Sequence, residues 1–289
     1  MTHALPHFLR SINNNLLYVR KPILHKILKL FYGFSALLYK RNAKHKSESV
    51  TITNFDGNLK LKLDIGGSIG ATVYWTGFHE FHELLFLHKF LKPKMVVVDA
   101  GANIGVFTLF AANRVPSGKV IAFEPVPSVH QRLQENIGLN HFKNITCVAK
   151  GLSDTTGTLP IYEIDSNNEG LSTLYPGDLR QLRHTEVPIV PLDETIASYS
   201  LQRLDLIKMD IEGGELMALR GMKKAIQDFR PIVMIEINQK AYTAAGYTPN
   251  DVYAFFRELG YTPHEITKSG ALRPSTSEAS FANIVFLPA

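Results

Sequence analysis

The chain has 289 residues, enough for one large α/β domain with additions, and its 45% hydrophobic and 20% charged residues are typical of a soluble globular protein. The net charge of +5 is uneven, because residues 1–50 hold nine Lys and Arg against one acid, Glu48, whereas residues 51–289 are mildly acidic. A mildly acidic main domain with no basic face around its motifs argues against nucleic acid as a partner.

Residues 1–48 form a basic extension that we expect to be partly helical. Its apolar stretch, residues 22–39, is interrupted by His25 and two lysines, so it makes a poor membrane span and a poor secretory signal. Two interpretations remain open. The segment is either a helix packed on the core or on a partner subunit of a homo-oligomer, or a basic amphipathic helix that contacts an anionic membrane through residues 20–46.

Residues 49–92 are predicted to form a hairpin and a helix that cap the main domain. Residues 49–55 and 59–65 alternate apolar and polar side chains around Asp56-Gly57-Asn58, which is typical of a hairpin. Residues 77–91 have apolar side chains at helical spacing and lead into the first core strand. The main domain is then expected over residues 93–289.

The turn after the first core strand is the most informative local motif. An apolar run ends in Asp99 and turns through Gly101 and Gly105 into an amphipathic stretch. The spacing Gly-Ala-Asn-Ile-Gly differs from the G-x-G-x-x-G of dinucleotide sites, and Asp99 places negative charge where a pyrophosphate would bind. A carboxylate there suits a cationic cofactor such as S-adenosylmethionine, so we assign Asp99, Gly101, Asn103 and Gly105 to cofactor binding.

The next two strands end in further polar residues. Residues 119–123 end in Glu124, which is placed to accept both ribose hydroxyls of an adenosine. Residues 145–149 lead to Ser153 and Asp154, which either meet the adenine edge or serve a turn or N-cap. Because the carboxyl ends of neighbouring strands in an open α/β sheet converge, these residues are expected at one crevice.

Between the third and fourth core strands we expect an added hairpin and a lid. Residues 158–164 and 187–192 have strand patterns, and the polar residues 165–186 between them are long enough for an active-site loop. The third core strand also holds the only cysteine, Cys147, so no internal disulfide forms and a reducing cytoplasm fits.

Three carboxylates follow the fourth and fifth strands and are candidates for catalysis. Asp210 and Glu212 lie two apart after residues 204–209, so on an extended backbone both point to the same side. Glu236 ends the fifth strand. Neighbouring like charges raise a carboxylate pKa, which suits a general base; a role as helix N-terminal charge is the alternative, favoured for Glu215.

The histidines are predicted to be non-catalytic. His79 and His82 are three residues apart but lack a third ligand, and neither His88 nor His184 completes a metal spacing. We therefore expect no metal site.

Together the segments DAGANIG, FEP, Ser-Asp, IKMDIEGGE and MIEI resemble the FkbM family of class I S-adenosylmethionine-dependent methyltransferases, from about Tyr74 to the C-terminus. The resemblance implies a Rossmann-like, doubly wound, mostly parallel seven-stranded α/β sheet and methyl transfer to oxygen. It implies acceptor hydroxyls on sugars, glycolipids or polyketide-type metabolites. Glu80 corresponds to an acidic position that precedes the core in the family and is added to the cofactor residues.

The sequence therefore predicts a cytoplasmic, S-adenosylmethionine-dependent O-methyltransferase, with membrane association through the basic extension left open. An N-methyltransferase is one alternative, because the acidic residues would also hold an amine. A non-catalytic S-adenosylmethionine-binding or scaffold protein is the other. The remaining expected elements are helices at residues 127–139 and 248–259 and strands at residues 231–237, 261–266 and 281–287.

Overall fold

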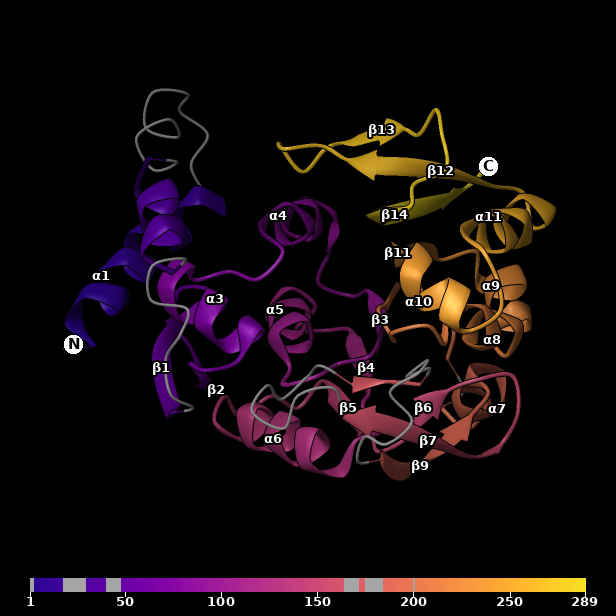
Figure 1. Ribbon diagram of the computed structural model, residues 1–289, viewed down its shortest axis with the longest axis horizontal. Helices are drawn as coiled ribbons and strands as arrows, with labels where there is room; N and C mark the ends of the chain where they lie inside the picture. The colour runs from indigo at the N-terminus through magenta and orange to yellow at the C-terminus, as the bar shows by residue number, and fades with distance from the viewer. Residues whose placement is uncertain (1–2, 18–29, 40–47, 164–171, 175–183, 200) are drawn as a thin grey trace.

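The computed structural model describes residues 3–17, 30–39, 48–163, 172–174, 184–199 and 201–289. Its centre is a sheet of eight strands in the order β13-β12-β14-β11-β10-β3-β4-β5 (Figure 1). The strands are β3 (Val96–Ala100), β4 (Lys119–Phe123), β5 (Ile145–Val148), β10 (Leu206–Met209), β11 (Ile232–Asn238), β12 (Tyr261–Ile266), β13 (Leu272–Pro274) and β14 (Phe281–Pro288).

The predicted α/β class is confirmed. From β5 to β11 every pairing is parallel, and β14 runs antiparallel between β11 and β12. The sheet has one strand more than the expected seven, because β13 pairs with the end of β12. This short strand has only three residues, too few for a clear alternation of apolar and polar side chains.

Helices cover both faces of the sheet, as a doubly wound fold requires (Figure 1). Val97 and Leu206 pack in one core cluster, whereas their neighbours Val98 and Ile207 pack in the cluster on the other face. The first face is covered by α4 (Phe81–Phe90), α5 (Val106–Arg114) and α6 (Pro127–Gly138). The second is covered by α7 (Leu192–Ala197), α8 (Glu215–Arg220), α9 (Lys223–Phe229), α10 (Gln239–Ala244) and α11 (Pro249–Glu258).

The helix predicted over residues 77–91 is wrong at its start. Gly77, at φ 88°, ends a separate helix, α3 (Ser68–Thr76), and α4 begins only at Phe81. Helix α3 was missed because Val73, Tyr74 and Trp75 are all buried, so its sequence has no polar face to reveal a helical period.

The two predicted hairpins are present. β1 (Ser49–Phe55) pairs with β2 (Leu59–Asp64), and β7 (Gly157–Glu163) pairs with β9 (His184–Val190). The second hairpin belongs to a small sheet with β6 (Gly151–Leu152) and β8 (Ser172–Thr173). Most of the predicted lid, residues 165–186, lies outside the described residues.

The N-terminal extension packs on the cap formed by residues 49–92. It contains α1 (Ala4–Asn13), a 3-10 turn (Asn14–Leu17) and a further helix over residues 30–39. The buried Arg10 donates to Asn54 Oδ1 at 2.9 Å and to the carbonyl of Tyr74, so α1 is tied to both the hairpin and α3. Because burial lowers the pKa of Arg10 to about 10, these acceptors are needed to offset its desolvation.

One buried ion pair attaches the first hairpin to the main domain. Arg114 of α5 donates to both carboxylate oxygens of Asp56, at 2.6 and 2.9 Å, and its guanidinium lies 3.3 Å from the centre of the Phe110 ring. The Asp56 side chain is fully buried. Burial makes the pair sensitive to loss of either partner.

Arg114→Met should therefore lower the free energy of unfolding by about 3–5 kcal/mol, because it leaves a buried carboxylate without this cation. Urea unfolding followed by circular dichroism measures the change. Lys224→Met, which removes an exposed ion pair with Asp228, is the matched control and should leave the midpoint nearly unchanged. Equal effects of the two substitutions would contradict the role given to Asp56.

Candidate active site

A cavity of about 460 Å³ lies at the carboxyl ends of β3, β4, β10 and β11. This is the crevice in which open α/β sheets bind ligands, and its volume suits a small molecule. Eight of the predicted site residues line it: Glu80, Gly101, Asn103, Glu124, Ser153, Asp210, Glu212 and Glu236.

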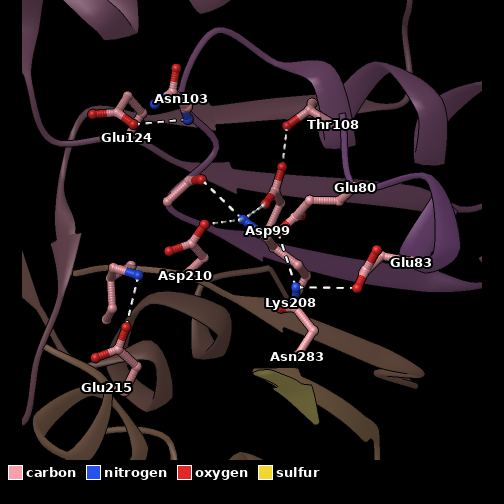
Figure 2. Close-up of polar contacts among 12 residues, drawn as sticks. Glu80, Glu83, Asp99, Asn103, Thr108, Glu124, Lys208, Asp210, Glu215 and Asn283 are labelled. Carbon is pink, nitrogen blue, oxygen red and sulfur yellow. Dashed lines mark hydrogen bonds and ion pairs between the residues drawn. The ribbon is translucent and has the colours of Figure 1, made fainter. Parts of the chain in front are cut away.

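Glu124 is held by backbone donors at the end of β4 (Figure 2). Its Oε2 accepts from the Asn103 N–H at 2.9 Å and its Oε1 accepts from the Val126 N–H at 3.0 Å. Burial raises the pKa of Glu124 to about 7. A carboxylate has about four lone-pair sites, so each oxygen can still accept a ligand hydroxyl.

Gly101 is required by close packing of the turn against β10. It has φ 79°, and a Cβ at this position would lie 1.9 Å from the carbonyl oxygen of Asp210. Any side chain would therefore push apart the two loops that form the cavity floor.

Three cavity residues other than glycine have left-handed backbone conformations. Glu80, Asn103 and Glu212 have φ of 53°, 50° and 52°. Such conformations are costly for side chains with a Cβ and concentrate at ligand-binding sites. Here they fix the directions of three polar side chains on the cavity wall.

Three predicted cofactor residues do not line the cavity. Asp99 is fully buried behind it, where Oδ2 accepts from Thr108 Oγ1 at 2.5 Å and Oδ1 has no hydrogen-bond partner. Gly105 is the N-cap residue of α5 at φ 95°, and a Cβ there would lie 2.7 Å from Leu133, so its role is helix packing. Asp154 lies beside Ser153 but outside the lining. The geometry therefore does not favour direct contact between a cofactor and any of these three residues.

Lys208 is a cavity residue that was not predicted from the sequence (Figure 2). Its Nζ lies 3.7 Å from Asp210 Oδ2, 3.9 Å from Asp99 Oδ1 and 3.4 Å from the carbonyl of Gly101. Burial alone would lower the pKa of Lys208, but Asp210 and Asp99 raise it above its ordinary value. A lysine inside the otherwise apolar strand Leu206–Met209 was the available signal.

Glu212 and Glu236 have pKa values close to neutrality. Burial, then the charge of Asp210, raises the pKa of Glu212 to about 7 and that of Glu236 to about 8. Burial also raises the pKa of Glu215 to about 7, but this side chain is fully buried at the start of α8 and accepts from the N–H groups of Ile211 and Gly213. These contacts favour the structural alternative for Glu215, a role at the N-terminus of a helix.

The opposite wall adds two more carboxylates. Asn283 Nδ2 donates to Glu80 Oε1 at 3.0 Å and to Glu83 Oε1 at 3.4 Å, which holds the two acids side by side (Figure 2). Burial and the charge of Glu80 raise the pKa of Glu83. Sequence reasoning missed Glu83, which occupies an ordinary position in the first turn of α4.

His79 also lines the cavity, although the sequence analysis treated the histidines as non-catalytic. Burial lowers its pKa, so the imidazole is neutral at pH 7 and able to accept a proton. Within the described residues, no group of three or more His, Cys, Asp or Glu side chains is arranged to hold a metal ion.

The cavity wall therefore carries many more acidic than basic side chains. Among the described residues that line the cavity, one is a lysine or arginine, Lys208, and six are aspartate or glutamate. A ligand with cationic groups would relieve this repulsion, and S-adenosylmethionine carries an ammonium and a sulfonium. The acids are Glu80, Glu83, Glu124, Asp210, Glu212 and Glu236.

Comparison with known proteins is consistent with this geometry. Residues 99–263 match the model of the methyltransferase FkbM domain. Methyltransferase sdnD of Sordaria araneosa is 31% identical over 210 residues, covering 63% of this chain and 78% of that protein. The matched family range contains Glu124, Lys208 and Glu236.

Two further relatives have more specific names. The 31-O-demethyl-FK506 methyltransferase FkbM of Streptomyces tacrolimicus is 31% identical over 162 residues, covering 47% of this chain and 62% of that protein. The 2-O-methyltransferase NoeI of Sinorhizobium fredii is 25% identical over 164 residues, covering 52% of this chain and 67% of that protein.

Lys208→Met should lower the free energy of unfolding by about 3–5 kcal/mol, because Asp99 then stays buried without its cation. Adding Asp99→Asn should recover part of this loss, which a double-mutant cycle in urea measures. Lys62→Met, which removes a more exposed ion pair with Glu135, is the control and should have little effect. Additive effects of the two cavity substitutions would show that Lys208 and Asp99 are not coupled.

Proposed function

This chain belongs to the FkbM methyltransferase family, and on that premise we propose that it transfers a methyl group from S-adenosylmethionine to a hydroxyl of a sugar, glycolipid or secondary metabolite. The main support is that Glu124 and the carboxylates Asp210, Glu212 and Glu236 line one cavity. The names of the relatives FkbM and NoeI, which specify 31-O and 2-O positions, favour oxygen as the acceptor atom.

In this proposal Glu124 accepts the ribose hydroxyls, and the backbone from Gly101 to Asn103 lies against the methionine end of the cofactor. Ser153 is proposed to meet the adenine edge. When bound, the cofactor supplies an electrophilic methyl group on a sulfonium. Asp99, behind the wall, and Lys208, in the wall, would fix the charge and position of the turn after β3 and of Asp210.

A carboxylate at the ends of β10 and β11 is proposed to take the proton of the acceptor hydroxyl. Glu236, with a pKa of about 8, holds a proton in the ligand-free protein at neutral pH. A cation in the cavity lowers that pKa and leaves the carboxylate free to accept a proton. Asp210 and Glu212 would orient the hydroxyl. Such a base typically contributes about 10²–10⁴ in rate, and positioning of the acceptor contributes more.

The alternatives make different demands on the same residues. An N-methyltransferase needs less base strength, and a non-catalytic binding protein needs none. A tritiated methyl-donor assay over sugar, glycolipid, polyketide and amine acceptors separates the three, because only the proposed enzyme labels hydroxyl acceptors.

A cytoplasmic location and a homo-oligomeric state belong to the proposal as well. None of the described helices is long and apolar enough to cross a membrane.

Glu124→Ala should weaken S-adenosylmethionine binding by about 1–3 kcal/mol, because the ribose loses a charged acceptor. Isothermal titration calorimetry measures the change. Asp154→Ala is the matched control, since that carboxylate lies outside the cavity lining and should not alter affinity. Unchanged affinity of a folded Glu124→Ala protein would remove Glu124 from cofactor binding.

Glu236→Gln should reduce turnover by about 10²–10⁴, a much larger effect than the modest loss of cofactor affinity that follows from removing one negative charge. Turnover of the unmodified protein should rise with pH, because the base acts in its ionised form, with an apparent pKa at or below the value of about 8 for the empty site. Glu236→Gln should remove this rise. If His79→Gln removes it and Glu236→Gln does not, the neutral histidine is the base and this assignment is wrong.

A further inference from the structure

The helix over residues 30–39 exposes a row of apolar side chains. Leu30, Phe34 and Leu37 recur at helical spacing on one face and are 75%, 49% and 62% exposed. Phe31, next to this row, is 37% exposed. Soluble proteins rarely leave such contiguous apolar surface uncovered unless it binds something.

The opposite face of the same helix is firmly packed. Ser35 is fully buried and accepts from Asn13 Nδ2 of α1 at 3.0 Å. Tyr32 packs on Phe81 of α4, with ring centres 5.3 Å apart. The helix is therefore anchored to the domain, and the exposure of Leu30, Phe34 and Leu37 is a property of the docked helix.

Helix α1 adds to the apolar surface of the extension. Leu5 and Phe8 lie one turn apart and are 43% and 57% exposed. Of the large hydrophobic side chains that are exposed in the described part of the chain, all but Phe281 belong to this extension. Figure 1 shows α1 and the helix that follows it together at one end of the molecule, away from the central sheet.

The sequence around this surface is strongly basic. Residues 20–46 contain eight Lys and Arg and no acid. These eight residues lie outside the described part of the chain and flank the helix over residues 30–39 in the sequence. An apolar helix with basic flanks matches the two parts of an anionic lipid surface, the acyl chains and the headgroups. A second copy of the chain fits less well, because the same sequence flanks of both copies carry eight positive charges and no acid.

We propose that the face formed by Leu30, Phe34 and Leu37 docks this protein on an anionic membrane. The helix lies in the plane of the interface with its apolar side chains among the acyl chains, and the positive charge of the sequence that flanks it attracts the anionic headgroups. Membrane docking of this kind does not depend on methyl transfer.

Co-sedimentation of the full chain with vesicles tests the proposal. The vesicles are phosphatidylcholine alone or phosphatidylcholine with 30% phosphatidylglycerol, at low and at high salt. We expect binding to the anionic vesicles only, weakened by salt. The triple variant Leu30→Gln/Phe34→Gln/Leu37→Gln should bind at least about tenfold more weakly, because it removes three apolar anchors.

Phe281→Gln is the matched control, because Phe281 is 68% exposed but lies on β14, outside the extension. It should bind the anionic vesicles as the unmodified chain does. Thermal melts confirm that each variant is folded. Equal binding to neutral vesicles, or unchanged binding of the folded triple variant, overturns the proposal. A lack of vesicle binding also overturns the proposal. If light scattering then shows a dimer that the triple variant abolishes, the apolar face binds a second copy of the chain instead.

Discussion

The site depends on one buried cation among carboxylates. Parallel strands bring their carboxyl ends to a single edge, so Asp99 at the end of β3, Asp210 after β10 and Glu236 in β11 are forced toward one another. Lys208 lies between Asp99 and Asp210 and offsets part of their repulsion. Without it, the turn after β3 would pack a buried, uncompensated charge against the cavity floor.

Lys208 does not balance the acidic side chains of the cavity. Burial, and after it the charge of Asp210, raises the pKa of Glu212 to about 7 and that of Glu236 to about 8, so the empty site holds protons that a cation would displace. Three strained residues, Glu80, Asn103 and Glu212, keep polar groups directed at the same space. A cationic methyl donor is the ligand chemistry that fits both observations, and it agrees with membership of the FkbM methyltransferase family.

The sequence was sufficient where local pattern and tertiary position agree. The strands Lys119–Phe123 and Tyr261–Ile266 were predicted to the residue, since each has apolar side chains bounded by turn signals. The sequence was insufficient where a side chain contacts residues that are distant in the chain. How deeply Asp99 is buried, and which carboxylates Lys208 pairs with, depend on which strands are neighbours in the sheet. Helix α3 was missed for a different reason, because it has no polar face to reveal a helical period. Placement of Glu124, Asp210, Glu212 and Glu236 at one crevice was predictable, because it follows from parallel strand order.

Proton release on cofactor binding tests whether a bound cation lowers the pKa of the cavity carboxylates. At pH 6.5 a free α-amino group, with a pKa of about 7.7–8.0, is already protonated, so it contributes little to proton exchange. Calorimetric titration of S-adenosylmethionine in buffers of different ionisation enthalpy then measures the protons exchanged by the protein. The cavity described here predicts a net release, reduced in Glu236→Gln, because the cation lowers the pKa of Glu212 and Glu236. Binding with no proton release, or with proton uptake, would contradict it.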